Sequence, residues 1–190
     1  MYQGHNPAAL RSQKEIVNAF FELLKTNSFE HISIKQIMDE TALSRQTFYQ
    51  IFNSKEDIFE YYINKIFKQY TNKHENIILS NPCEIAKFLF PLFAQYYDFF
   101  KILIDNHQNC LLQRKCIEYF QNNPHIQYHL KGTHSPSQQA YASVFIMSGI
   151  VSVLEKWIKD ESRDFLDVHK LTMLICQITG TDIKDNISSL

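Results

Sequence analysis

Glycine and proline are scarce in this chain of 190 residues, which has four glycines and five prolines. All-β sandwiches and barrels use both residues at their many turns, and phosphate-binding loops need closely spaced glycines. The composition therefore argues against both. Hydrophobic residues make up 45% of the chain and charged residues 21%, within the range of ordinary globular proteins.

The chain also lacks the excess of positive charge that is common in nucleic-acid-binding proteins. Its formal net charge is −1, and its first 60 residues carry six lysines and arginines against eight aspartates and glutamates. Any affinity for phosphate must therefore come from a few well-placed cations and from helix N-termini, because bulk attraction is missing.

We find no sign of export or of a membrane. The first residues lack the apolar core of a signal peptide, and no apolar run reaches the length of a membrane span. The four cysteines, Cys83, Cys110, Cys116 and Cys176, show no paired spacing. The simplest interpretation is a cytoplasmic protein with reduced cysteines.

No complete catalytic or metal-binding set is recognisable. His125 and His129 would lie one turn apart on a helix, a spacing that can hold a metal, but no carboxylate or second histidine pair completes the ligands. We prefer solvated histidines. A nucleophile elbow, a phosphate loop and paired carboxylates are all missing. We therefore expect no enzyme, no metal and no cofactor.

The stretch from Ser33 to Lys55 has the pattern of two short helices joined by a tight turn. Ser33 and Gln36 can form a capping box, and Ser44 is a natural N-cap of the second helix. Each helix has one apolar face, formed by Ile34, Ile37 and Met38 in the first and by Phe48, Ile51 and Phe52 in the second. We predict a helix-turn-helix whose second helix enters the major groove of DNA.

The other side chains of the second helix are suited to DNA. Arginine can form two hydrogen bonds with guanine, glutamine can do the same with adenine, and a threonine methyl can pack on that of thymine. Lys55, in the first turn of a helix capped by Ser54, would hold a phosphate with the help of that helix's amide groups. The predicted DNA-contacting residues are Ser33, Lys35, Ser44, Arg45, Gln46, Thr47, Tyr49, Gln50 and Lys55.

The rest of the chain is predicted to be helical, with no strand. Residues 1–9 show no periodicity. Apolar periodicity and cap-plus-proline starts indicate helices over 11–26, 54–79, 85–105, 107–121, 124–130, 135–160 and 164–179, with either a kink or one broken hydrogen bond at Pro91. The predicted fold class is all-α. A three-helix helix-turn-helix domain would occupy residues 1–53, and a larger helical domain residues 54–190.

Residues from about 12 to 67 resemble the DNA-binding domain of the TetR family of transcriptional regulators. The resemblance rests on Ile37, Leu43, Ser44, Thr47, Phe48, Tyr49, Phe52, Ser54, Lys55, Glu56 and Ile58. Ala42 stands where the family usually has a turn glycine, Gln46 where a glycine is often found, and Ile51 where a ring is common. The resemblance implies a dimeric protein that binds a double-stranded DNA operator.

A looser resemblance to the C-terminal domain of these regulators involves Phe145, Gly149, Ile150, Trp157 and Ile158. It implies a homodimer in which the last two long helices of each subunit form a four-helix bundle. Two long helices with wide apolar faces also favour a partner surface, although packing within one subunit is the alternative.

The same resemblance implies a small-molecule effector in the C-terminal domain. The ring-rich stretch 88–100 either lines such a pocket or forms plain core, and for any single ring the core is the safer interpretation. The candidate effector contacts are Phe93, Tyr96, Tyr97 and Phe100.

We therefore predict a cytoplasmic, dimeric transcriptional repressor of TetR type that a small apolar ligand releases from its operator. The alternative is a helical ligand-binding or adaptor protein whose helix-turn-helix no longer binds DNA. The negative charge of the first 60 residues and the missing turn glycine favour that alternative.

Overall fold

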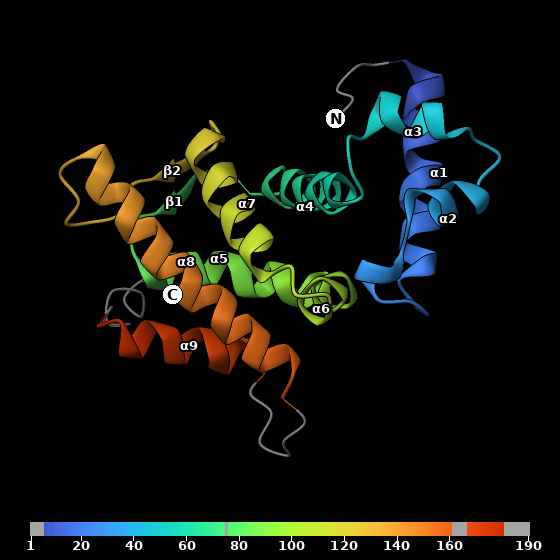
Figure 1. Cartoon of the computed structure of the whole chain (residues 1–190). Helices are drawn as coiled ribbons and strands as arrows, with labels where there is room; N and C mark the ends of the chain where they lie inside the picture. Colours follow the sequence, from blue (N-terminus) through green and yellow to red (C-terminus); the bar gives the residue numbers. More distant parts are fainter. Residues whose placement is uncertain (1–5, 75, 161–166, 181–190) are drawn as a thin grey trace. The chain divides into compact units, whose positions relative to one another are not determined.

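The computed structural model describes residues 6–74, 76–160 and 167–180, and its regular structure is almost entirely helical (Figure 1). The predicted all-α class, with an N-terminal helix-turn-helix domain and a larger helical remainder, is confirmed. The chain divides into two compact units, residues 1–65 and 66–190, which are described separately. The division falls within helix α4 (Glu56–Thr71), whereas the boundary predicted from sequence, between residues 53 and 54, stays a prediction.

The N-terminal unit contains α1 (Pro7–Leu23), the 3₁₀ helix η1 (Phe29–His31), α2 (Ile34–Asp39), α3 (Arg45–Ile51) and the first turns of α4. Helix α1 begins four residues before the predicted start at Arg11. The side chain of Asn6 accepts a hydrogen bond from the amide of Ala8, and Pro7 occupies the first helical position. Asn6-Pro7 is thus a cap-plus-proline start that the apolar periodicity did not reveal.

Aromatic rings hold the N-terminal unit together. Phe20 of α1 and Phe59 of α4 are fully buried, and their ring centroids lie 5.0 Å apart in an edge-to-face arrangement. Phe29 of η1 lies 5.2 Å from Phe59 and 6.1 Å from Phe20. Ile37 of α2 and Phe48 of α3 are also fully buried, so every helix of the unit contributes to one core.

The C-terminal unit contains the end of α4, β1 (Ile77–Leu79), α5 (Pro82–Gln95), α6 (Tyr97–Asp105), α7 (Asn109–Asn122), β2 (Ile126–Tyr128), α8 (Pro136–Ile158) and α9 (Val168–Ile178). Helix α5 contacts α6, α8 and α9, and α8 contacts α6 and α7. The core of the C-terminal unit includes Phe90, Phe93, Phe100, Leu112 and Leu154, each completely buried. Residues 161–166, where part of the last predicted helix falls, lie outside the described residues.

Two short strands replace helix that the sequence predicted. Helix α4 ends at Thr71 instead of reaching residue 79, and β1 pairs in parallel with β2, with Ile77 opposite Ile126. Asn76, just before β1, has a positive φ of 51°, which no helix can accommodate. Because residues 126–128 form β2, the short helix predicted over 124–130 is wrong. His125 and His129 are therefore not one helical turn apart. The described residues contain no group of three or more metal-binding side chains.

The long helix predicted over 85–105 is two helices. Helix α5 continues through Pro91, where a kink or one broken hydrogen bond was expected, and the break falls at Tyr96, whose φ of −117° and ψ of 36° are not helical. The amide of Tyr96 still donates to the carbonyl of Leu92, and the Tyr96 carbonyl accepts from the amide of Phe100. The two helices therefore share one residue as C-cap and N-cap.

Helix α8 lies within the range predicted for it, 135–160, and is strongly apolar. Its 23 residues are long and apolar enough that, by length and composition alone, it could cross a membrane. A core helix of a globular protein meets the same criteria, and α8 buries Met147 and Leu154 completely. One such helix is weak evidence for a membrane.

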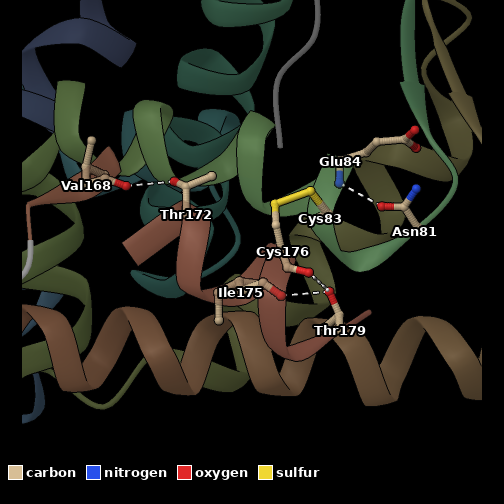
Figure 2. The surroundings of a disulfide bond; sticks show 8 residues. All are labelled: Asn81, Cys83, Glu84, Val168, Thr172, Ile175, Cys176 and Thr179. Carbon is tan, nitrogen blue, oxygen red and sulfur yellow. Dashed lines mark hydrogen bonds between the residues drawn. A yellow bond between two sulfur atoms is a disulfide. The ribbon is translucent and has the colours of Figure 1, made fainter. Parts of the chain in front are cut away.

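A disulfide joins Cys83, in the first turn of α5, to Cys176 of α9 (Figure 2). Their Cα atoms lie 4.4 Å apart although 93 positions separate them in sequence, and both side chains are buried. The prediction of four reduced cysteines is therefore wrong for this pair. Cys110 and Cys116 are free thiols; burial raises the pKa of the Cys116 thiol well above its ordinary value.

Candidate nucleic-acid interface

Local hydrogen bonds close the helix-turn-helix, among them the capping box that the sequence predicted. The Ser33 hydroxyl accepts from the amide of Gln36 at 3.2 Å, and the Gln36 side chain accepts from the amide of Ser33 at 2.9 Å. In the turn, the Thr41 hydroxyl donates to the carbonyl of Met38 and accepts from the amide of Leu43. These bonds fix where α2 begins and how the chain leaves it.

The turn does not need the missing glycine. Among the described residues other than glycine, only Asn76 and His107 have a positive φ, so Ala42 has an ordinary backbone conformation. An alanine costs stability at a turn only where the left-handed region is required. The substitution of alanine for the family's usual glycine therefore gives no reason to doubt this helix-turn-helix.

Helix α3 presents the predicted outward face. The Ser44 hydroxyl accepts from the amide of Thr47 at 3.2 Å, which caps the helix, and it lies 3.0 Å from the Thr47 hydroxyl. Phe48 and Ile51 are buried, which fixes the inner face. The side chains of Arg45, Gln46, Tyr49 and Gln50 are exposed, while Thr47 is half-buried.

The hydroxyls of Ser33 and Ser44 are already used as helix caps. Both residues are nevertheless exposed, as is Lys35 in the first turn of α2. Within the described part of the chain, neither Lys35 nor Arg45 is in an ion pair. The two cations are thus available to an external anion, and their predicted contacts with DNA remain predictions.

Helix α3 contains no acidic residue, although the N-terminal unit as a whole is negatively charged. Its sequence, Arg-Gln-Thr-Phe-Tyr-Gln-Ile, contains one cation and no carboxylate. The eight acidic residues among the first 60 lie instead on α1, η1, the end of α2 and α4. Glu15, Glu22 and Glu40 line a hollow of about 410 Å³ between α1 and the turn. A negative unit can therefore still offer a helix that does not repel phosphate.

Lys55 has hydrogen-bond partners within the protein, and its phosphate contact stays a prediction. Its ammonium donates to the carbonyls of Phe29 at 2.6 Å, Ile32 at 2.8 Å and Glu30 at 3.3 Å. Helix α4 begins at Glu56, two residues after the predicted N-cap Ser54. The first-turn carboxylate of Asp57 accepts from the amide of Asn53 instead, at 2.9 Å. No local pattern indicated these long-range partners of Lys55.

The candidate effector residues do not share one surface. Phe93 and Phe100 are fully buried and pack edge to face with their centroids 4.7 Å apart, as core residues do. The half-buried Tyr97 packs on Trp157 with the centroids 5.5 Å apart, and Tyr96 forms the break between α5 and α6. The effector contact stays a prediction for all four residues.

Helices α8 and α9 expose large apolar side chains. Tyr141 and Phe145, one turn apart on α8, are 78% and 81% exposed, and Val144 beside them is 50% exposed. On α9, Leu174 is 41% and Ile178 69% exposed. Val144 also lines a hollow of about 330 Å³ whose other walls come from α7. This set of exposed residues on the two helices is called the apolar face below.

Comparison with known proteins agrees with the helix-turn-helix geometry. Residues 16–62 match the model of the bacterial regulatory proteins of the tetR family. The N-terminal unit is a TetR-family domain. The matched residues run from α1 into α4 and include the whole helix-turn-helix. The matched family consists of regulators, which is consistent with the prediction that the protein is not an enzyme.

Two further comparisons concern individual regulators. The HTH-type dhaKLM operon transcriptional activator DhaS of Lactococcus lactis subsp. lactis (strain IL1403) is 31% identical over 65 residues, which are 34% of this chain and 35% of that protein. The chain therefore matches only about a third of that relative. A solved structure of a dihydroxyacetone kinase operon activator DhaS covers 90% of this chain and 94% of its own, with 20% identity and a TM-score of 0.49.

Proposed function

We propose that this chain is a DNA-binding transcriptional regulator that reads an operator with helix α3. One observation carries the proposal: a TetR-family domain holds α3 with its inner face buried and with an exposed, acid-free face of arginine, glutamine and tyrosine. These side chains can contact base edges and phosphates. The rival interpretation, an adaptor that has lost DNA binding, loses one of its two supports because Ala42 does not strain the turn.

DNA binding is tested by titrating the protein with labelled DNA from upstream of its own gene. Replacement of Arg45 or Gln50 by alanine should cost about 1–3 kcal/mol of binding free energy and relax base preference at one position. Matched controls are Lys68→Ala and Gln69→Ala, exposed residues of α4 in the other unit. Equal DNA binding by all four variants would contradict the proposal that α3 contacts the operator bases.

The regulator is proposed to act as a homodimer through the apolar face. Monomeric proteins rarely expose neighbouring large apolar side chains, and readers of two half-sites need two-fold symmetry. Phe145→Asp should dissociate the dimer and abolish operator binding, because it would bury a charge without a partner. Gln121→Asp, at an exposed position of α7, is the control. A wild-type monomer in light scattering at micromolar concentration would refute the homodimer.

The direction of regulation is proposed as repression in the cytoplasm, relieved by a small apolar ligand. Such a ligand must bind the DNA-free state better, because equal affinity for both states shifts nothing. The second candidate is activation, because the related DhaS is a transcriptional activator. A reporter gene behind the operator, measured with and without the protein, separates the two by the sign of the change.

A further inference from the structure

Lys55 occupies a site built from backbone carbonyls. An ammonium group has three N–H donors and no acceptor. The three carbonyl oxygens of Phe29, Glu30 and Ile32 lie 2.6, 3.3 and 2.8 Å from its nitrogen, so each donor has one acceptor. The nitrogen also lies 4.3 Å from the centroid of the Phe29 ring, where the face of the ring attracts a cation. Lys55 is half-buried in this position.

The carbonyls come from a part of the chain that Lys55 could not reach through local structure. They belong to η1 and to Ile32, which follows η1 and precedes the N-cap of α2, and they lie 23 to 26 positions from Lys55 in sequence. Lys55 itself lies between the end of α3 and the start of α4. One side chain therefore connects the segment that enters the helix-turn-helix with the segment that leaves it.

We propose that Lys55 is a positioning residue for α2 and α3 and does not bind a DNA phosphate. The proposal rests on the proposed DNA-binding function and adds how the reading helix is held. A phosphate contact would require the ammonium to give up carbonyls that it binds in the free protein. The end of a helix also carries partial negative charge on its carbonyls, which a cation stabilises.

Lys55→Arg separates the two roles, because it keeps the charge and changes the geometry. A guanidinium can still bind a phosphate, but its planar fork cannot direct three donors from one nitrogen to three converging carbonyls. Lys55→Met removes the charge and keeps an apolar stem over Phe29. If only a tenth of the molecules keep α3 in the competent position, operator affinity falls about tenfold. We expect that fall for both variants.

The salt dependence of operator binding supplies the second measurement. Each lost phosphate contact lowers the slope of log affinity against log salt by about one. Lys55→Arg and Lys55→Met should keep the wild-type slope and lower the unfolding midpoint. Lys35→Met, at an exposed position of α2, should lower the slope and keep the midpoint. Wild-type affinity in Lys55→Arg together with a reduced slope in Lys55→Met would overturn the proposal, as would wild-type behaviour of both variants.

Two measurements on the full chain do not depend on DNA. Hydrogen exchange over residues 34–51 should be faster in both Lys55 variants and unchanged in Lys35→Met. An amine-reactive label should modify Lys55 of the wild-type protein more slowly than Lys35. Because this measurement needs no variant, it still tests the proposal if the Lys55 variants fail to fold. Equal labelling of the two lysines would overturn the positioning role. Wild-type protein that protects Lys55 but binds no DNA would instead contradict the proposed function alone.

Discussion

Reduction of the Cys83–Cys176 bond should destabilise the C-terminal unit. The bond joins positions 93 residues apart, and in the chain-entropy description a loop of that length contributes about 4–5 kcal/mol by restricting the unfolded chain. Measured contributions are typically about 2–4 kcal/mol, and we expect a loss in that range. The bond links α5 to α9, which carries Leu174 and Ile178 of the apolar face. Reduction should therefore also weaken the proposed dimer.

The assay is urea unfolding followed by circular dichroism, with and without a reductant. Wild-type protein should lose stability when reduced, whereas Cys83→Ala should respond to urea equally in both conditions because it has no cross-link to lose. Cys116→Ala is the matched control: it removes a buried free thiol and should stay sensitive to the reductant. Peptide mass spectrometry of the unreduced protein should recover the fragments around Cys83 and Cys176 as one species.

An identical urea midpoint for oxidised and reduced wild-type protein would refute this reasoning. So would alkylation of all four cysteines in protein unfolded without a reductant, because the two sulfurs would then be neighbouring thiols. Disulfides are rare in the reducing cytoplasm, where those that form are mostly transient or redox-sensing. The cellular redox state of this pair is therefore a direct test of the proposed location as well.

Three further outcomes are expected. Ser44→Ala should cost about 1 kcal/mol of unfolding free energy through loss of the α3 cap, while Ser54→Ala, which caps no helix, should cost under about 0.5 kcal/mol in the same urea titration. Phe93→Ala should cost about 3–5 kcal/mol as a core residue, and a much smaller loss would favour an effector site there. The hydrogen bond from Lys115 lowers the pKa of Glu118, so this pair stabilises the fold above the ordinary carboxyl pKa of 4.5 and loses its effect as the pH falls further. Glu118→Gln should flatten the acid side of the stability profile, and an unchanged profile would count against the pair.

The helix-turn-helix could be predicted because its determinants are local. A capping hydroxyl such as that of Ser44 acts on an amide three residues away, and the apolar faces repeat within one or two helical turns. The cap-plus-proline starts of α5 and α8 were predictable for the same reason, since Asn81 and Ser135 accept from amides three residues on. These signals do not depend on what the helix later packs against.

Sequence patterns misjudged elements whose state depends on a distant partner. Ile77 and Leu79 are apolar and follow a helix, so a longer helix was the economical prediction. Strand β1 exists because β2, some fifty residues later, supplies the hydrogen-bond partners that a three-residue strand cannot supply itself. The helix predicted over 124–130 was wrong for the same reason, because residues 126–128 form the other strand of this pair.

Lys55 shows most clearly what the sequence determined and what only the tertiary structure decided. Its charge and its position just before α4 are properties of the sequence, and they were enough to predict a phosphate contact. The partners of that charge are set by the packing that brings η1 beside the end of α3. Cys83 and Cys176 are a second example, because only the contact between α5 and α9 brings their sulfurs together. Local hydrogen bonds and apolar periodicity are written into neighbouring residues, whereas a cation or a thiol acquires its role from whichever distant group folding places against it.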